Sequence, residues 1–415
     1  MKYVIIGNSA AGLSACERIK TNDPSCEITI VSEETYSNYS RPLISYYLKD
    51  KVSKENMFYR DEAFYLKNNI ELILANKAVD VDSVAKKVVL ADGTVLSYDK
   101  LLIATGSIPF VPPVEGMKDQ PNIFTFLSMK DSEQIKAYAK KDMKVVIVGG
   151  GLIGLKAAEG LNKICSDITV LELSDRLLAT ILDKKGSDII GNQIASAGVK
   201  YLLGDTASKI QGKDKVESLV LKSGKIIPCD LLVMAVGVRP NVELAQKAGV
   251  TLNRGIITNE YLETSIKDIF AAGDCTVSLD VIDGNHKILA LWPNAVFQGK
   301  IAGENMAGKP SLYNGNFPMN AIDFFGLQVM TCGVVNSDDD YEIKKVETEQ
   351  FYKKFSIKDD TLAGYILIGV PERAGIYNSL VRDKTKLSTL QGDLLDPIGI
   401  MHFTQEERTK KIYGV

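Results

Sequence analysis

The chain has 415 residues, a formal net charge of −3, and acidic and basic side chains interspersed along its length. That length is too great for one hydrophobic core and predicts two or three domains. The charge pattern offers no basic patch for nucleic acid, and no apolar run reaches the length of a membrane span. Met1 leads into an apolar strand rather than a signal peptide, so we expect a cytoplasmic protein with no membrane partner.

The first predicted element is an apolar strand that ends in a glycine-rich turn with Gly7, Ser9 and Gly12 at its small positions. The first glycine permits the tight bend, the middle residue lets the backbone approach a diphosphate, and the last lets the next helix pack on the strand. Ala10 and Ala11 open that helix, whose free N–H groups favour phosphates. One such turn is read equally well as a strand–helix junction without a ligand.

A second apolar strand at 27–31 runs into Ser32, Glu33 and Glu34. We expect the Glu33 carboxylate to bind the ribose hydroxyls of a dinucleotide. The alternative for both acids is a solvated charge at a strand end.

The tyrosine-rich stretch that follows is irregular, with a helix expected over 53–67. Alternating residues at 88–100, with Asp92-Gly93 at their centre, predict a hairpin. A buried strand at 101–104 then leads to the next turn.

A second unit repeats this order of elements. Its turn carries Gly149, Gly151 and Gly154, and its helix opens with Leu152 and Ile153. All three small positions are glycine, so this is the stronger of the two matches.

Glu172 lies 18 residues after Gly154, at the end of the next strand. That position suits a carboxylate on a ribose 2′-hydroxyl. The unit then has a hairpin at 222–225 and a strand at 231–235. Two such turns in one chain predict two dinucleotide sites, and we expect a protein with two dinucleotides to move electrons between them.

The thiol and imidazole groups give no second kind of site. No cysteine pair has C-x-x-C or C-x₄-C spacing, and we expect no bound metal. The two histidines have no nearby thiol or carboxylate partner in the sequence, which leaves Ser–His and Cys–His catalysis unsupported. The residues concerned are Cys16, Cys26, Cys165, Cys229, Cys275, Cys332, His286 and His402.

These motifs resemble those of the FAD-dependent pyridine nucleotide oxidoreductases, the two-dinucleotide-binding flavoproteins that include disulfide reductases, NADH oxidases, rubredoxin reductases and the flavin part of NADH-dependent nitrite reductases. Five motifs stand in the family's order: the two glycine-rich turns, residues 104–106, 236–241 and 269–274. The implied fold class is α/β, with a Rossmann-like NAD domain inserted into a Rossmann-like FAD domain and an α+β domain at the C-terminus. The implied boundaries are 1–112 with 236–314 for FAD, 113–235 for NAD(H), and 315–415 for the C-terminal, interface-like domain.

The resemblance implies a set of cofactor contacts. For FAD they are Gly7, Ser9, Ala10, Ala11, Gly12, Glu33, Arg41, Pro42, Val79, Ala104, Thr105, Gly106, Gly273, Asp274 and Trp292. For the nicotinamide dinucleotide they are Gly149, Gly151, Leu152, Ile153, Gly154, Glu172 and Gly237. Glu172 favours NADH over NADPH, and Arg176 is the one feature against that preference.

The branch of the family is indicated by residues 39–43, Tyr-Ser-Arg-Pro-Leu, where disulfide reductases carry redox-active sulfur. This stretch is similar to that of rubredoxin reductases and nitrite-reductase flavin domains, which implies that Arg41 lies near the flavin. A surface salt bridge is the alternative for Arg41. Residues 364–375, a strand leading into a helix, also look like that branch.

Lys156 stands where many relatives have glutamate. It is a candidate for electrostatic stabilisation of anionic reduced flavin. Pairing with Glu159, or pointing to solvent, is the alternative.

The resemblance implies a reductase that passes electrons between NADH and a small iron protein, rubredoxin or ferredoxin, or an iron–sulfur partner subunit. The alternatives are an NADH oxidase that reduces oxygen, and a flavoprotein subunit of a larger complex such as a nitrite reductase-like system. The oligomeric state stays open, a homo-oligomer included. The tail 392–415 is either a docking element or a solvated terminus.

Overall fold

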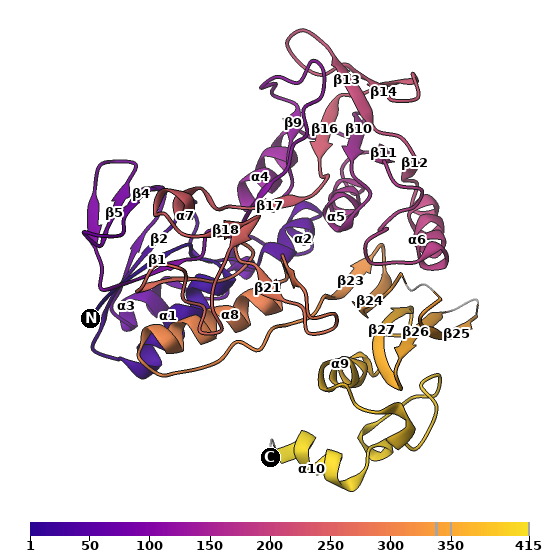
Figure 1. The fold of residues 1–415 in the computed structure, drawn as a ribbon. Helices are drawn as coiled ribbons and strands as arrows, with labels where there is room; N and C mark the ends of the chain where they lie inside the picture. Colours follow the sequence, from indigo (N-terminus) through magenta and orange to yellow (C-terminus); the bar gives the residue numbers. More distant parts are fainter. Residues whose placement is uncertain (337–338, 349–350, 414–415) are drawn as a thin grey trace. The chain divides into compact units, whose positions relative to one another are not determined.

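A computed structural model describes residues 1–336, 339–348 and 351–413 (Figure 1). The chain forms two compact units. The first contains Met1–Phe110 and Val238–Asn316, and the second contains residues 111–237 together with those from 317 onward. No helix among the described residues is long and apolar enough to cross a membrane.

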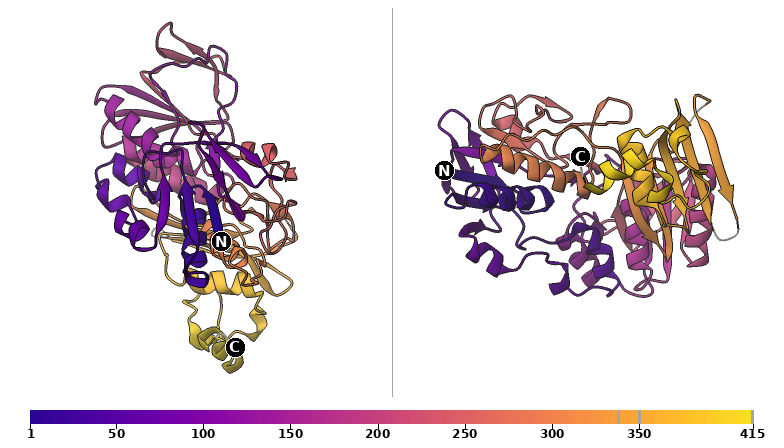
Figure 2. Two further views of the ribbon diagram at one scale, coloured as in Figure 1. Left: turned by 90° about the vertical axis from the view of Figure 1, so that its left-hand side faces the viewer. Right: turned by 90° about the horizontal axis from the view of Figure 1, so that it is seen from below.

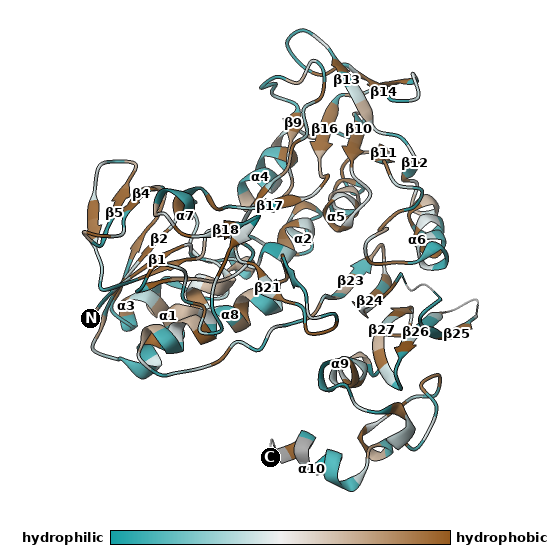
Figure 3. Cartoon of the chain, viewed as in Figure 1, coloured by the Kyte–Doolittle hydropathy of each residue, from teal (hydrophilic) through white to brown (hydrophobic). Residues whose placement is uncertain are grey.

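The first unit is built on a five-stranded parallel sheet with the order β20-β7-β1-β2-β3. Its strands are β1 (Lys2–Ile6), β2 (Glu27–Val31), β3 (Ile70–Ile73), β7 (Lys100–Ile103) and β20 (Ile269–Ala271). Their near-continuous apolar runs, brown in Figure 3, are expected of a parallel sheet that is covered on both faces.

One face of this sheet is covered by α1 (Ala10–Asn22) and α8 (Trp292–Met306), which lie side by side (Figure 2, right). Small residues make the close approach possible. A Cβ atom on Gly299 would lie 2.2 Å from the Ala11 carbonyl oxygen, and one on Gly303 would lie 2.4 Å from that of Ala15. The tight packing fixes the start of α1, which follows the first glycine-rich turn.

The other face of the sheet packs on a three-stranded antiparallel sheet. This sheet contains β4 (Ala78–Asp82), β5 (Lys87–Leu90) and β6 (Val95–Ser97). The predicted hairpin is confirmed, with Gly93 at a φ of +89° and the Asp92 carboxylate accepting the Thr94 N–H at 2.9 Å.

The helix expected over 53–67 is broken into two pieces, a 3₁₀ turn at Glu55–Met57 and α3 at Glu62–Lys67. Asn38 explains the break, because its Oδ1 accepts the N–H groups of Tyr59 and Arg60 at 3.1 and 2.8 Å. These donors are therefore unavailable to a continuous helix. Asp61 restarts the helix by accepting the Phe64 N–H at 2.9 Å.

Shorter elements complete the first unit. They are the 3₁₀ turn Arg41–Leu43, α2 (Ile44–Leu48), β8 (Ser107–Pro109), β17 (Val238–Pro240), α7 (Glu243–Lys247), β18 (Leu252–Asn253), β19 (Gly255–Ile256), β21 (Ser278–Leu279) and β22 (His286–Lys287).

The second unit contains another five-stranded parallel sheet, in the order β12-β11-β10-β16-β9. Its strands are β9 (Ile123–Phe124), β10 (Lys144–Val148), β11 (Asp167–Glu172), β12 (Lys200–Leu203) and β16 (Leu231–Met234). Its helices are α4 (Met129–Tyr138), α5 (Leu152–Leu161) and α6 (Lys184–Ser196). A hairpin sheet of β13 (Ala207–Gln211), β14 (Ser218–Leu221) and β15 (Ile226–Pro228) shares a core with it, and the turn predicted at 222–225 joins β14 to β15.

The C-terminal part of the second unit is an antiparallel sheet in the order β23-β24-β27-β26-β25. Its elements are β23 (Met319–Phe324), β24 (Leu327–Gly333), β25 (Glu342–Glu347), β26 (Tyr352–Lys358), β27 (Thr361–Ile368), α9 (Ala374–Asp383), 3₁₀ turns at Leu387–Thr389 and Ile400–His402, and α10 (Gln405–Tyr413). The strands predicted at 350–357 and 364–370 correspond to β26 and β27, and the first residue of the former range lies outside the described residues. Buried rings of Phe355, Tyr365 and Tyr377 join this sheet to α9.

The C-terminal sheet contacts α6 through Asp183. This carboxylate caps the helix by accepting the Gly186 N–H at 2.9 Å, and it also accepts the Tyr352 hydroxyl at 2.8 Å. Lys354, almost wholly buried, lies 3.2 Å from the same carboxylate. One acid thus fixes both the start of α6 and the position of β26.

Candidate functional site: two glycine-rich turns

The first glycine-rich turn joins β1 to α1, and its geometry demands the residues found there. Gly7 has a φ of +117°, and a Cβ atom on it would lie 2.2 Å from the Ala104 carbonyl oxygen. A Cβ on Gly12 would lie 1.9 Å from the Gly7 carbonyl oxygen. Ser9 caps α1 without a side-chain hydrogen bond, so the cap leaves the first N–H groups of Ala10 and Ala11 for an anion.

The second turn joins β10 to α5 with the same geometry. Gly149 has a φ of +115°, and a Cβ there would lie 2.3 Å from the Ala235 carbonyl oxygen. A Cβ on Gly154 would lie 1.9 Å from the Gly149 carbonyl oxygen. Gly151, by contrast, has nothing within 4 Å of such an atom, so the start of α5 at Leu152 and Ile153 has an open side. An open backbone at a helix N-terminus fits a diphosphate.

Glu172 ends β11 beside this turn. Its two carboxylate oxygens accept the N–H groups of Gly150 at 2.6 Å and Ser174 at 2.7 Å. Each oxygen keeps a second lone pair, so the carboxylate is held in place and still able to accept from ribose hydroxyls. Arg176 is engaged with the Asp175 carboxylate at 2.8 Å.

The registers of the two sheets give a finding that the sequence spacing missed. Gly7 N–H donates to Val31 at 2.8 Å, and Gly149 N–H donates to Leu171 at 2.7 Å. Val31 and Leu171 are therefore equivalent, and the residue equivalent to Glu172 is Ser32. Glu33, the predicted ribose ligand, is the next residue along, and its side chain is exposed.

Arg41 opens the 3₁₀ turn in which Pro42 is the next residue. Its guanidinium lies 2.5 Å from the Glu34 carboxylate and stacks over the Tyr39 ring, 5.3 Å from the centroid. Both members of the ion pair are half-buried, unlike an ordinary surface salt bridge. Desolvation opposes the charge of Arg41, but Tyr39 and Glu34 outweigh it and raise its pKa.

Asp274 and its neighbours form the second polar cluster of the first unit. Burial raises the pKa of the Asp274 carboxyl, while a 3.2 Å hydrogen bond from Ser107 and the charge of Arg41 act in the opposite direction. Gly273 has a φ of +89°, and its N–H is held by the buried Gln298 side chain at 2.7 Å. The predicted set lacks Ser107 and Gln298. Ser107 directly follows Gly106 and was within reach of motif reasoning, whereas Gln298 lies on α8 and carries no local signal.

The remaining predicted residues occupy well-defined positions. Ala104 bonds back to β1, and Thr105 donates its hydroxyl to the Asn241 carbonyl at 2.6 Å, while Gly106 and Gly237 have φ values of +66° and +131°. Trp292 opens α8 with its ring edge-on to Tyr59 at 5.8 Å, and the Val79 carbonyl accepts the Lys247 ammonium at 2.9 Å.

Lys156 is paired with Glu159, one turn further along α5, and both side chains are nearly buried. Its ammonium also donates to the Asp323 carbonyl at 3.1 Å, in the C-terminal sheet. This is the pairing that the sequence left open as an alternative to a role at the flavin.

The six cysteines are free thiols, and all are buried. Cys275, next to Asp274, is the one adjacent to a predicted cofactor residue. Burial raises its pKa to about 11 and that of Cys229 to about 12, which disfavours the thiolate that thiol chemistry requires. No group of three His, Cys, Asp or Glu side chains within the described parts of the chain is placed to hold a metal.

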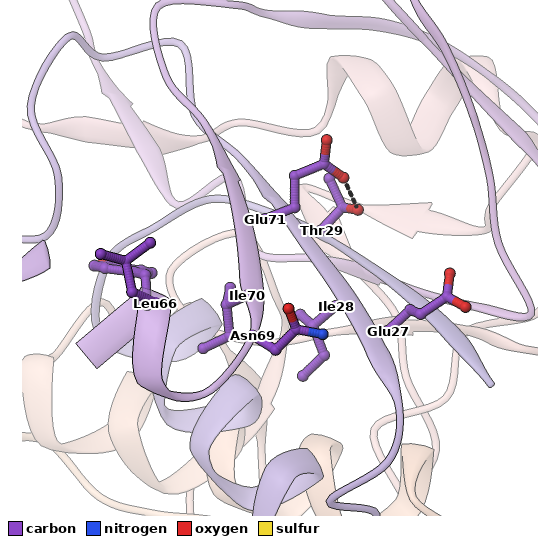
Figure 4. Close-up of a pocket in the computed structure, with 8 residues that line it drawn as sticks. Glu27, Ile28, Thr29, Leu66, Asn69, Ile70 and Glu71 are labelled. Carbon is purple, nitrogen blue, oxygen red and sulfur yellow. Dashed lines mark hydrogen bonds between the residues drawn. The ribbon is translucent and has the colours of Figure 1, made fainter. Parts of the chain in front are cut away.

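A hollow of about 270 Å³ on the first unit lies at the edge formed by β2 and β3 (Figure 4). It is next to the starts of these strands, whereas ligands of parallel sheets bind beyond the carboxyl ends. Its acids are already paired, since Glu71 accepts the Thr29 hydroxyl at 2.8 Å and Glu27 lies 3.8 Å from Lys2. We do not assign this hollow to the site.

Comparison with known proteins identifies the family. Residues 1–299 match the family described as pyridine nucleotide-disulphide oxidoreductase. The chain belongs to this family. Residues 318–385 match the domain described as rubredoxin NAD+ reductase C-terminal domain.

Three relatives illustrate the family's range. A nitrite reductase [NAD(P)H] of Bacillus subtilis is 32% identical over 404 residues, which are 96% of this chain and 49% of that protein. The chain thus spans about half the length of that relative. An NADH oxidase of Methanocaldococcus jannaschii is 36% identical over 317 residues, 74% of this chain and 70% of that protein. The crystal structure of NADH:rubredoxin oxidoreductase from Clostridium acetobutylicum superposes with a TM-score of 0.77 at 26% identity, over 93% of this chain and 96% of that one.

Membership of the pyridine nucleotide-disulphide oxidoreductases implies a flavin and a nicotinamide dinucleotide, and the residues present fit both. In each turn the first and last glycines allow a close backbone approach that a Cβ atom would block, and in the second turn Gly151 leaves the helix start open. Each turn is followed by a helix whose cap makes no side-chain hydrogen bond. The chain is therefore a member of the pyridine nucleotide-disulphide oxidoreductases with an α/β fold.

Proposed function

We propose that this flavoprotein passes electrons between NADH and a small iron protein of the rubredoxin or ferredoxin type, through FAD and without a cysteine relay. FAD would be held by the Gly7–Gly12 turn, Arg41 and Asp274, and NADH by the Gly149–Gly154 turn and Glu172. The observation that carries the proposal is the burial of all six thiols, with the Arg41–Glu34 pair in the stretch where disulfide reductases carry sulfur.

When bound, a flavin takes two electrons as hydride and releases them one at a time, which matches a nicotinamide donor to an iron centre. The protein's own residues bind and orient. The helix N-termini of α1 and α5 neutralise diphosphate charge, Glu172 accepts ribose hydroxyls, and Asp274 is the acceptor for the ribityl chain. We nominate no proton-transfer residue.

The C-terminal domain supports a protein acceptor, since its match is to the C-terminal domain of rubredoxin reductases. The free thiols are typical of a reducing compartment, which supports a cytoplasmic location.

The decisive measurement is turnover of the FAD-loaded chain with NADH and, in parallel, an artificial dye, a rubredoxin, a [2Fe–2S] ferredoxin and dissolved oxygen alone. We expect reduction of the dye and of at least one iron protein at rates well above oxygen uptake. If the chain reduced the dye but neither iron protein, the proposed acceptors would be rejected.

Two alternatives rest on specific observations. The likeness to an NADH oxidase favours oxygen as acceptor and predicts oxygen uptake as fast as dye reduction. The half-length match to a nitrite reductase favours a flavoprotein subunit of a larger complex, and predicts co-purification with an iron–sulfur protein. A chain that fails to turn over NADH with any acceptor would be a non-catalytic flavoprotein.

A further inference from the structure

Asn8, the second residue of the first glycine-rich turn, has an unusual combination of burial and free hydrogen-bonding capacity. Its side chain is 7% exposed. Its Oδ1 accepts the Tyr65 hydroxyl at 3.0 Å, whereas its Nδ2 finds no acceptor among the residues that the structure describes. A buried amide donor without a partner costs stability, so its retention at a ligand-binding turn calls for an explanation.

The direction in which the Asn8 amide faces is fixed by a chain of hydrogen bonds. Asn38 Oδ1 accepts two backbone N–H groups, so Asn38 Nδ2 must be the donor to the Tyr65 hydroxyl, at 2.8 Å. The single hydroxyl hydrogen of Tyr65 is then left for Asn8, whose Oδ1 takes it. If the Asn8 amide were reversed, the Tyr65 hydroxyl would face two donors and its own hydrogen would lose its acceptor. The chain therefore leaves Asn8 Nδ2 as a free donor.

The second turn shows that this side chain is particular to the first. The residue equivalent to Asn8 is Gly150, where a Cβ would lie 2.9 Å from the Glu172 Cβ and 2.7 Å from Leu177. There the backbone N–H of Gly150 holds Glu172, an acceptor for ribose. In the first turn Ser32 takes the place of that acid, and Asn8 supplies a side-chain donor where the second turn has none. The two turns thus offer opposite hydrogen-bonding characters.

A second orphan lies on the same network. The Tyr59 hydroxyl is buried and also has no hydrogen-bond partner in the described part of the chain. The backbone N–H of Tyr59 donates to Asn38 Oδ1, and the Tyr59 ring contacts Trp292, the first residue of α8.

We propose that Asn8 Nδ2 donates a hydrogen bond to an oxygen in the diphosphate–ribose stretch of FAD, and that Tyr65 and Asn38 are positioning residues which hold the amide in that orientation. This inference rests on the proposed binding of FAD at the first turn. Tyr65 contributes to FAD affinity only through Asn8.

The test measures FAD binding to the flavin-free protein through the quenching of flavin fluorescence. Two competitors are used: ADP, which carries the diphosphate, and adenosine, which lacks it. The variants are Asn8→Ala, Tyr65→Phe and the double variant. The matched control is Tyr98→Phe, which removes another buried, unpartnered hydroxyl of the first unit. NADH binding to the second turn and the melting temperature of the flavin-free protein report folding.

A hydrogen bond to a charged group supports an expected rise of about tenfold or more in the FAD Kd for Asn8→Ala. Tyr65→Phe should raise the Kd by a smaller factor, and the double variant should bind FAD no more weakly than Asn8→Ala. Asn8→Ala should weaken the binding of ADP. The binding of adenosine should be unchanged if the partner of Asn8 is a phosphate oxygen, and weakened if it is a ribose oxygen.

Unchanged FAD affinity in Asn8→Ala would overturn the proposal. So would an FAD Kd in the double variant that rises by the product of the two single-variant factors. Wild-type protein that binds no FAD would instead reject the proposed function. If Asn8→Ala loses its fold, the comparison of Tyr65→Phe with Tyr98→Phe decides, because equal FAD affinities in those two variants would overturn the role of the network.

Discussion

The carboxylate of Glu159 is shared between the Lys156 ammonium, on the same helix, and the backbone N–H of Phe325 at 3.3 Å, in the turn between β23 and β24. Gln193, on α6, donates to the Phe325 carbonyl at 2.8 Å. Phe325 has a φ of +50°, a conformation that is unfavourable for an aromatic residue. Helices α5 and α6 thus clamp both backbone groups of one strained residue, which fixes the C-terminal sheet to the parallel sheet of the second unit.

Removal of the Glu159 carboxylate should destabilise the second unit strongly. Glu159→Ala leaves the nearly buried charge of Lys156 without its carboxylate and the Phe325 N–H without its acceptor, and we expect a loss of about 3 kcal/mol in the free energy of unfolding. Urea denaturation of the flavin-free protein measures it. The control is Lys184→Ala, which breaks an exposed pair with Asp188 and should cost about 0.5 kcal/mol or less. Equal losses in the two variants would contradict the role of Glu159.

The sequence was sufficient for features that depend on local sterics. The two turns, their helices and the hairpin at Asp92-Gly93 follow from glycine positions and apolar periodicity, and the structure has all of them. It was insufficient where a distant side chain decides. The helix expected over 53–67 is interrupted because Asn38, far away in sequence, takes its backbone donors.

The site divides in the same way. Glu172 was predicted from its spacing, and the structure places it beside its turn because strand, turn and acid lie in one βαβ unit. The Asn8–Tyr65–Asn38 chain and the pairing of Arg41 with Glu34 join residues whose proximity depends on the tertiary fold. Lys156 shows the limit of sequence reasoning. The sequence indicates that Glu159 lies one helical turn away, but it does not indicate that the turn at Phe325 contacts this pair.

The raised pKa of Asp274 predicts that the flavin-free protein loses folding stability as the pH rises. Its pKa is raised in the folded state, so the folded chain binds the proton more tightly than the unfolded chain. The contribution of the protonated acid to stability is therefore present below the ordinary carboxyl pKa and is lost as the pH rises through the folded-state pKa. Asp274→Asn should melt at a higher temperature than wild type at pH 7, with the difference vanishing near pH 4.

The same substitution should weaken FAD binding, because a carboxylate accepts hydrogen bonds from ribityl hydroxyls more strongly than an amide does. Ser107→Ala removes the local hydrogen bond to Asp274 and is the control. Its melting temperature should keep the pH dependence that Asp274 causes in the wild type. A melting difference between wild type and Asp274→Asn that stays constant from pH 4 to 7 would contradict the raised pKa.

Activity should not depend on thiols. All six cysteines are buried, and burial raises the pKa of Cys165 to about 11, so iodoacetamide should leave NADH–dye turnover largely intact in the folded protein. Mass spectrometry after reaction should find little label, whereas the urea-unfolded chain should take up six. Rapid inactivation that maps to a single cysteine would show that a thiol takes part in electron transfer.

The choice of nicotinamide should follow from Glu172. Its carboxylate is held at the end of β11 by the N–H groups of Gly150 and Ser174, and it can accept hydroxyl hydrogen bonds from the ribose of NADH. The 2′-phosphate of NADPH would lose those bonds and add repulsion between like charges, at a cost on the order of 2 kcal/mol, or tens-fold in specificity. Arg176 is engaged with the Asp175 carboxylate, the Asn336 side chain and the Leu182 carbonyl, so it could offset this cost only by giving up such contacts. We therefore expect kcat/KM for NADH to exceed that for NADPH by that factor, and Glu172→Ala to narrow the gap. Asp175→Ala, which removes the ion pair of Arg176 without touching the carboxylate of Glu172, is the matched control and should keep most of the preference. Equal kcat/KM values for the two nucleotides in the unmodified protein would refute this assignment of Glu172.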